Sequence, residues 1–233
     1  MLPTYNESEN IGRLVHIILK LNEDYEIVAV DDDSPDGTGR ILDEISVAER
    51  RVHVIHRQGR RGRGIAGAIG FVECLRLAPD AVVEMDADFS HDPGFIPELV
   101  SGLDGADLVI ASRFVDGGRD LRGFFRRALS RFSNLYVKNV LGIAVRDCTS
   151  GFRAFSASAL AGVKPGRLTS KGPSIVQEAL LKCLSNGIRI KEVPYTFYER
   201  RSGRSKLSFK TLFKTLFVAT GMALSYRLRG RLA

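Results

Sequence analysis

Cysteine and long uncharged apolar runs are both scarce in this 233-residue chain. The three cysteines, Cys74, Cys148 and Cys183, are scattered and lack metal-site spacing. This pattern argues against a disulfide framework and predicts reduced thiols in a cytosolic compartment. No uncharged apolar run reaches the ~18 residues that a membrane span needs, so we expect no bilayer-spanning helix. The opening Met-Leu-Pro-Thr lacks the pattern of a signal peptide, so we expect no secretion signal.

Acidic residues are outnumbered by basic ones. The 27 Asp and Glu residues against 34 Lys and Arg leave a formal charge of +7. This excess predicts an anionic partner: a nucleic acid, nucleotide phosphates or an acidic membrane. Composition alone does not choose among them. The balance of 44% hydrophobic and 26% charged residues predicts a globular protein, and the length fits one α/β domain with or without a small appendage.

Segments typical of strands and helices alternate along the first half of the chain. Apolar spacing predicts strands at 26–31, 52–56, 81–86 and 107–111, and helices near 11–19, 41–45, 65–77 and 95–103. Asn6 and Glu9 resemble a capping box, which predicts that the first helix begins beside them. The second half is expected to hold helices at 121–141, 173–186 and 207–228, a short strand near 155 and a strand at 188–197. This alternation predicts a mostly parallel, doubly wound sheet.

Acidic side chains follow several of the expected strands. Glu7 comes after a short first strand, Asp31 and Asp32 end the second, and Asp86 and Asp88 end the fourth. Ligands of an open α/β sheet bind outside the carboxyl ends of its strands. We therefore expect these residues, distant in sequence, to gather along one edge of the sheet.

Asp86-Ala87-Asp88 is the sharpest of these features. Two carboxylates that flank a small residue after a buried strand suit Mg²⁺ or Mn²⁺, which bind one or two carboxylates together with substrate phosphate oxygens. The alternative is a solvated acidic turn.

The run Asp31-Asp32-Asp33-Ser34-Pro35-Asp36-Gly37 is the second feature. Adjacent acids repel one another, so a purely structural role requires compensating cations or donors. A carboxylate here could accept hydrogen bonds from a base or a ribose. The alternative is an exposed turn that caps the following helix, and both roles are compatible for different acids of the run.

An ordered set of motifs resembles the family 2 glycosyltransferases, with the dolichol- or polyprenol-phosphate mannose synthase group as the nearest pattern. The motifs are Pro3-Thr4-Tyr5-Asn6-Glu7, Val30-Asp31-Asp32-Asp33-Ser34-Pro35-Asp36-Gly37-Thr38, Met85-Asp86-Ala87-Asp88-Phe89-Ser90-His91, Ser112-Arg113-Phe114, Ser150-Gly151-Phe152, Glu192-Val193-Pro194 and Arg200-Arg201-Ser202-Gly203-Arg204-Ser205-Lys206. The resemblance covers nearly the whole chain. It implies a GT-A (Rossmann-like) fold with a mostly parallel sheet flanked by helices.

The resemblance also implies roles for individual residues. The expected contacts to the nucleotide part of the donor are Pro3, Tyr5, Glu7, Val30, Asp32 and Ala87. The expected metal site is Asp86, Asp88 and Ser90. Asp86, Asp88, Arg113 and Arg126 are the expected catalytic residues, and Arg113, Arg126, Arg200 and Lys206 are expected to face donor or acceptor phosphates.

The reaction implied by the resemblance is inverting transfer of mannose from GDP-mannose to polyprenyl (dolichyl) phosphate, with Mg²⁺ or Mn²⁺ as cofactor. Two alternatives stay open: a UDP-glucose-dependent glucosyltransferase acting on the same acceptor, and a nucleotide-binding module without turnover. A nucleic-acid binder is disfavoured by the acids at the ligand edge and by the absence of a nucleic-acid motif.

Glycines punctuate a basic loop after the third expected strand, in the pattern Gly62-x-Gly64-x-x-Gly67. The pattern matches a dinucleotide-binding fingerprint, but it follows the third strand and its lead-in is rich in arginine, so we discount that reading. Relatives have a Gly-x-Gly turn at this place, and Arg63 is unusual because the family normally has an apolar residue there.

The end of the chain combines apolar and basic residues. We expect a catalytic domain at 1–205 and an amphipathic helix at 206–233 that suits a bilayer interface, with packing on the core or a dimer contact as alternatives. The basic helix near 124–136 is a second interfacial candidate. These features predict a peripheral enzyme at the cytoplasmic face of a membrane, with a possible separate membrane-anchoring subunit. Only Met1 and Leu2 precede Pro3, so we expect either a short first strand or a natural start upstream.

Overall fold

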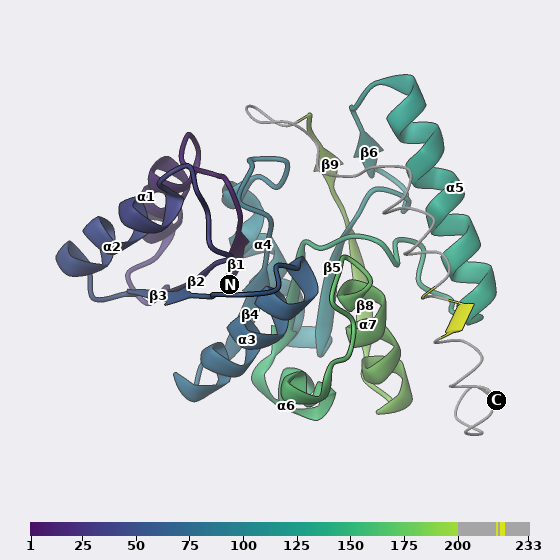
Figure 1. Cartoon of the computed structure of the whole chain (residues 1–233). Coiled ribbons are helices and arrows are strands. Elements are labelled where there is room, and N and C mark those ends of the chain that lie inside the picture. Colours follow the sequence, from purple (N-terminus) through teal and green to yellow (C-terminus); the bar gives the residue numbers. More distant parts are fainter. Residues whose placement is uncertain (200–217, 219, 222–233) are drawn as a thin grey trace.

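The computed structural model describes residues 1–199 together with Val218, Thr220 and Gly221. A central sheet runs through the molecule, and helices cover both of its faces (Figure 1). The strands are β1 (Leu2–Thr4), β2 (Ile27–Asp31), β3 (Val52–His56), β4 (Ala81–Glu84), β5 (Leu108–Ser112), β6 (Arg119–Asp120), β7 (Arg153–Ser156), β8 (Ile190–Pro194) and β9 (Thr196–Phe197). The helices are α1 (Ile11–Leu21), α2 (Thr38–Ala48), α3 (Arg63–Arg76), α4 (Ile96–Ser101), α5 (Phe124–Leu141), α6 (Ala157–Val163) and α7 (Ile175–Ser185), with the 3-10 turns η1 (Pro93–Phe95), η2 (Gly102–Gly105) and η3 (Pro165–Arg167).

The sheet is built from two blocks. Strands pair in the order β1-β2-β3, all parallel, and in the order β4-β7-β5-β8, where only β7 is antiparallel to its neighbours. Met1 joins the blocks: its amino group donates to the Val83 carbonyl at 2.7 Å, and its own carbonyl accepts from the Met85 amide at 3.3 Å. These bonds place β1 beside β4 in a parallel arrangement. The ends of β1, β2 and β4 therefore meet at one edge.

Alternation along the strands divides the core between the two faces of the sheet. In β2, Val28 and Val30 belong to the same apolar cluster as Phe71 of α3. Ile27 and Ala29 belong to the cluster on the opposite face, with α1. These four residues of β2 are almost fully buried. Strands covered on both faces carry continuous apolar runs, which is why this segment is recognisable in the sequence.

The expected alternation of elements is confirmed, with boundaries within a few residues of those predicted. The expected strand at 188–197 divides into β8 and β9 around Tyr195. The predicted capping box is wrong. Helix α1 begins at Ile11 after Asn10, and Asn6 instead adopts a φ of 55° with its amide donating to Ser34 Oγ at 3.0 Å.

Most of the expected C-terminal helix at 207–228 lies outside the described residues. Val218, Thr220 and Gly221 are described and are helical, and the Tyr136 and Thr220 hydroxyls are 2.9 Å apart. Among the helices that the structure describes, none combines the length and the apolar character needed to cross a bilayer.

All three cysteines are unpaired and buried, in agreement with the sequence prediction of reduced thiols. Burial raises the pKa of Cys74, and it raises the pKa of Cys148 and of Cys183 to about 12. The reactive thiolate is therefore scarce at neutral pH.

We expect the native protein to react with a thiol-specific chromogenic disulfide far more slowly than the same protein in denaturant, where all three cysteines should react. The measurement is the time course of absorbance with and without guanidinium chloride. Fast stoichiometric labelling of the native protein would show that at least one of these thiols is accessible.

Candidate functional site

The loops after β1 and β2 are joined by hydrogen bonds from backbone amides to side chains. The Glu7 amide donates to Thr38 Oγ1 at 2.8 Å, and the Ser8 amide donates to Asp36 Oδ2 at 3.0 Å. Asp36 Oδ1 also accepts from the Thr38 hydroxyl at 2.6 Å. These bonds, with the Asn6 bond described above, use Asp36 of the acidic run and the hydroxyl groups of Ser34 and Thr38 beside it. Part of the acidic run therefore has a structural role, because these hydrogen bonds hold Glu7 beside the end of β2.

A third loop, residues 57–63 between β3 and α3, is called the arginine loop here. Arg57 forms an ion pair with Asp32, whose other oxygen accepts from the Gly62 amide at 2.6 Å. Arg61 pairs with Asp33 at 3.0 Å, and its guanidinium lies 4.9 Å from the centre of the Tyr5 ring. The resemblance implied that Asp32 and Tyr5 both contact the donor nucleotide. In the structure each of them contacts an arginine, Arg57 or Arg61, for which no role was predicted.

The last arginine of this loop reaches the acids at the end of β4. Arg63 donates from Nη2 to Asp86 Oδ1 at 2.9 Å and from Nη1 to Glu84 Oε1 at 3.1 Å. The Glu84 side chain is only 1% exposed, whereas that of Asp86 is 33% exposed. Burial lowers the pKa of the Arg63 guanidinium, but the two carboxylates outweigh it and raise that pKa above its ordinary value. Asp86 thus faces a permanent positive charge from the protein itself.

Asp88 and Ser90 form a compact turn below Asp86. Asp88 Oδ1 accepts from the Ser90 amide at 3.0 Å and from the Ser90 hydroxyl at 2.5 Å, and both residues are buried. The Asp86 amide donates to His91 Nδ1 at 2.9 Å. Burial lowers the pKa of His91, which favours the neutral ring that this hydrogen bond requires. The motif 86–91 is therefore a rigid turn that holds two carboxylates at the sheet edge.

Aromatic rings support this turn from below. His91 stacks on Phe152 with 4.9 Å between ring centres, and Tyr195 packs against Phe152 at 5.4 Å. The Tyr195 hydroxyl accepts from the Asp92 amide at 2.6 Å and lies 3.4 Å from the Ser90 carbonyl, to which it donates. The sequence analysis did not assign Tyr195. Its position directly after Glu192-Val193-Pro194, one of the family motifs, was the available signal.

Arg113 is held inside the protein by another acid. Its guanidinium donates to both oxygens of Asp147 at 2.8 Å and to Thr149 Oγ1 at 2.7 Å. Burial lowers the pKa of Arg113 and raises that of Asp147, but their mutual attraction wins in each case. The Phe197 ring lies 5.3 Å from the same guanidinium. Arg113 was predicted to face a phosphate, and in this structure its donors are directed to protein partners.

The remaining predicted residues are spread over the site and beyond it. Pro3 and Val30 pair with each other in the register of β1 and β2, and Ala87 is buried between the two acids of its motif. Arg126 lies on α5 and pairs with Glu199. Arg200 and Lys206 lie outside the described residues.

The oxygen ligands at the end of β4 fit a hard divalent cation. Mg²⁺ and Mn²⁺ bind one or two carboxylates and complete their coordination with substrate phosphate and water. Asp86, Asp88 and Ser90 supply such oxygens on one turn. Within the described part of the chain, no group of three His, Cys, Asp or Glu side chains is placed to hold a metal alone. The metal role of these three residues stays a prediction, and it requires phosphate oxygens from the substrate.

The family model of glycosyl transferase family 2 matches residues 1–163 of the chain. The chain belongs to glycosyltransferase family 2. This match includes the first five motifs on which the resemblance rested.

Named relatives are similar to this chain over nearly its whole length. A polyprenol monophosphomannose synthase of Mycolicibacterium smegmatis is 38% identical over 100% of this chain and 87% of its own length. An undecaprenyl-phosphate mannosyltransferase of Micrococcus luteus is 36% identical over 99% of this chain and 95% of its own. A dolichol-phosphate mannosyltransferase of Pyrococcus furiosus is 37% identical over 93% of this chain and 60% of its own.

Solved structures confirm the GT-A fold expected from the sequence. Glucosyl-3-phosphoglycerate synthase from Mycobacterium tuberculosis, in complex with phosphoglyceric acid, superposes with a TM-score of 0.67 at 22% identity, covering 94% of this family 2 chain and 78% of that one. A mannosyltransferase from Pyrobaculum calidifontis, in complex with GDP-Man and Mn²⁺, gives a TM-score of 0.55 at 17% identity, with coverages of 96% and 72%.

The buried pair of Arg113 and Asp147 supports a stability prediction. Asp147→Asn leaves the guanidinium inside the protein without its counter-charge, which is expected to cost about 3–5 kcal/mol of the free energy of unfolding. Asp116→Asn is the matched control, because Asp116 is exposed and its contact with Arg146 is 3.5 Å long. Urea denaturation followed by circular dichroism measures both. Equal unfolding free energies for the two variants would contradict the importance of the pair.

Proposed function

We propose that this protein transfers mannose from GDP-mannose to a polyprenyl phosphate, with inversion at the anomeric carbon. The observation that carries the proposal is the arrangement of Asp86 and Asp88 on a buttressed turn at the end of β4, beside the loops that follow β1 and β2. The named relatives described above, which match almost all of the chain, support this substrate pair. Glucosyl transfer from UDP-glucose is the second candidate, because no described contact discriminates the donor base or the hexose.

The chemistry requires charge stabilisation more than proton transfer. The acceptor phosphate is already anionic near neutral pH, so its oxygen attacks without a strong general base. A bound divalent cation would neutralise the developing charge on the departing nucleoside diphosphate. Asp86, Asp88 and Ser90 would hold that cation. Attack on the face opposite the leaving group, through an oxocarbenium-like transition state, inverts the anomeric centre.

The donor nucleotide is assigned to strands β1 and β2 and the loops that follow them. Pro3, Tyr5, Glu7, Val30 and Asp32 are the proposed contacts, with Ala87 next to the diphosphate. Asp32 already accepts hydrogen bonds from Arg57 and Gly62, so it would act on the nucleotide while held in position by the arginine loop. Arg126 and Arg200 of the catalytic segment 1–205 and Lys206 at the start of segment 206–233 are the proposed phosphate contacts. Arg113 was the fourth residue predicted for this role, and its guanidinium is directed to Asp147 and Thr149.

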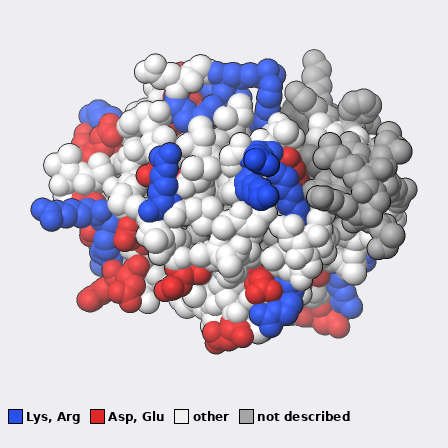
Figure 2. Space-filling model, turned by 90° about the horizontal axis from the view of Figure 1, so that it is seen from below, with Lys and Arg blue, Asp and Glu red and all other residues white. Residues whose placement is uncertain are grey.

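Over the residues that the structure describes, the face of the molecule seen from below lacks the charge pattern of a nucleic-acid binder (Figure 2). On the face of the molecule seen from below, acidic and basic side chains are interspersed with broad uncharged areas and form no continuous basic stripe (Figure 2). A basic stripe or patch is the usual footprint of a nucleic-acid binder. This face therefore gives no support to a nucleic-acid partner, and we assign the excess of positive charge to contacts with nucleotide and lipid phosphates.

A donor panel tests the reaction directly. GDP-mannose, UDP-glucose and UDP-N-acetylglucosamine, each labelled in the sugar, are incubated with polyprenyl phosphate and Mg²⁺ or Mn²⁺. We expect label to enter the organic phase from GDP-mannose, and transfer from UDP-glucose alone would establish the second candidate instead. Asp88→Asn is expected to lower the rate by about 100-fold or more through lost transition-state stabilisation.

The control for this variant is Asp104→Asn, because Asp104 is an exposed acid of η2. It should transfer mannose at the rate of the unmodified protein. A folded Asp88→Asn protein with unimpaired transfer would eliminate the proposed role of the acidic turn.

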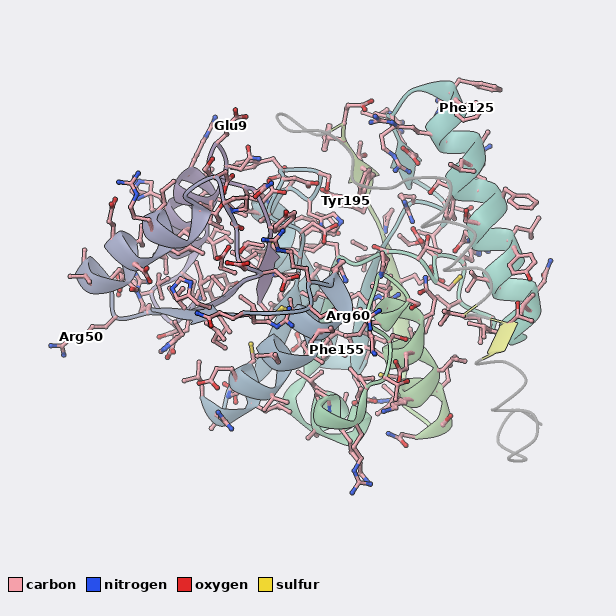
Figure 3. The ribbon with its side chains drawn as sticks, in the orientation of Figure 1. Glu9, Arg50, Arg60, Phe125, Phe155 and Tyr195 are labelled. Carbon is pink, nitrogen blue, oxygen red and sulfur yellow. The ribbon has the colours of Figure 1, made fainter. Side chains whose placement is uncertain are left out.

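Helix α5 is the proposed contact with the membrane surface. Its exposed face carries large apolar side chains, with Phe124 78% exposed, Phe125 67% and Phe132 59%. Phe125 points away from the sheet at the outer end of the helix (Figure 3). Arg127 and Arg131 are exposed on the same helix. Aromatic side chains beside cations suit the interface of an anionic bilayer. A peripheral position at the cytoplasmic face, with or without a separate anchoring subunit, fits this surface.

Co-sedimentation with vesicles that contain anionic phospholipid tests this assignment. Replacing Phe124, Phe125 and Phe132 together by Ser removes apolar contacts worth about 1.5–3 kcal/mol each when fully buried. We expect vesicle binding to weaken by about tenfold or more. Val47→Ser on α2 is the control, since Val47 is 89% exposed and lies outside this face. Unchanged binding of the triple variant would show that another surface docks.

A further inference from the structure

Arg63 brings a positive charge into contact with the acidic residues at the end of β4. It is the first residue of α3, and its guanidinium extends to the end of β4. Both Nε and Nη2 donate to the same oxygen, Asp86 Oδ1, at 3.2 and 2.9 Å, while Nη1 donates to Glu84. The Arg63 guanidinium thereby connects the buried carboxylate of Glu84 to Asp86, one of the two proposed cation ligands.

Gly151 lies directly against the Arg63 guanidinium. A Cβ atom at Gly151 would lie 2.7 Å from Arg63 Nη2, closer than side-chain carbons come to other atoms. Gly151 has no left-handed φ in its backbone, and the atom that its Cβ would meet is the end of the flexible Arg63 side chain. The guanidinium thus lies against the backbone at Gly151 as well as against two carboxylates, and the Arg63 side chain is 22% exposed.

The backbone that carries Arg63 is fixed. Gly62 and Gly64 on either side pack so closely on the segment 170–172 that a Cβ at either would lie 2.3 Å or less from a carbonyl oxygen of Ser170 or Lys171. The Gly64 amide also donates to the Lys171 carbonyl at 3.1 Å. Because this packing and hydrogen bond hold the backbone on the segment 170–172, we expect any release of Asp86 by Arg63 to come from rotation of the side chain.

We infer that Arg63 acts as a tethered cation which competes with the divalent metal for Asp86 and so sets the metal affinity of the site. This inference rests on the proposed function, in which Asp86 and Asp88 hold the metal. A guanidinium in contact with Asp86 neutralises part of the charge that attracts a divalent ion, and it repels that ion at close range. An arriving nucleoside diphosphate offers the guanidinium another anionic partner, so metal and donor would displace it from Asp86 together.

The test is Mn²⁺ binding, measured from the loss of the free-ion electron paramagnetic resonance signal, with Mn²⁺ alone and again with GDP added. In Arg63→Leu we expect the affinity for Mn²⁺ alone to rise about tenfold or more, since a like charge is removed from contact with a ligand. The gain should shrink when GDP is present. Unchanged or weaker Mn²⁺ binding would overturn the inference, and weaker binding would show instead that Arg63 orients Asp86 for the metal.

Two further variants keep the test decisive. Arg63→Gln is neutral but retains a donor for the buried Glu84, so it is expected to fold and to bind Mn²⁺ more tightly even if Arg63→Leu unfolds. Arg60→Leu removes the same charge from an exposed position of the same loop and should leave the affinity unchanged (Figure 3). An equal gain in Arg60→Leu would overturn the inference, because the effect would then be the net charge of the loop.

The variant Asp88→Asn separates this inference from the proposed function. If that variant loses Mn²⁺ while Arg63→Leu binds it with the affinity of the unmodified protein, the metal site stands and only the role of Arg63 fails. If Arg63→Leu gains affinity but no donor of the panel is used, the role of Arg63 stands and the proposed reaction fails. Absence of Mn²⁺ binding in every variant overturns both.

Discussion

The site depends on arginines that neutralise the negative charge of the carboxylates at the strand ends. These arginines come from a loop and a helix start, and not from the strands of the sheet. Carboxylates clustered at the end of parallel strands repel one another, and burial increases that cost. The arginine loop supplies one guanidinium to Asp32, one to Asp33 and one to Asp86. Without these pairs the acids could not be held so close together in the absence of substrate. In the proposed function, a nucleoside diphosphate and a metal would share the site with these positive charges.

Rigidity beneath the acidic turn is the second constraint. His91 stacks on Phe152, and Tyr195 packs edge-on against Phe152. The Tyr195 hydroxyl connects the turn at Ser90 and Asp92 to the segment between β8 and β9. Catalytic groups must be held to a small tolerance, which side chains achieve when their own neighbours are locked by packing. In this protein the packing is aromatic: His91 belongs to the turn itself, whereas Phe152 and Tyr195 come from segments that lie far from the acids in sequence.

Arg113 illustrates why a correct motif gives an incomplete account of a residue. Its place in Ser112-Arg113-Phe114 indicated a basic group near phosphate, but the sequence offered no sign that Asp147 takes both sides of the guanidinium. The two residues are 34 positions apart, and their encounter depends on how α5 and the following loop pack on β5. The same holds for the predicted capping box, since the loop around Asn6 is shaped by side chains of the loop after β2.

The sequence by itself determined the alternation of strands and helices, the family, and the acids at the ends of β2 and β4. These depend on local periodicity and on short ordered motifs, which survive without knowledge of neighbours. Tertiary structure alone decided which arginine faces which acid, that Arg63 spans Glu84 and Asp86, and that Tyr195 holds the acidic turn. These are contacts between distant segments, and their geometry is fixed only when the two faces of the sheet are packed.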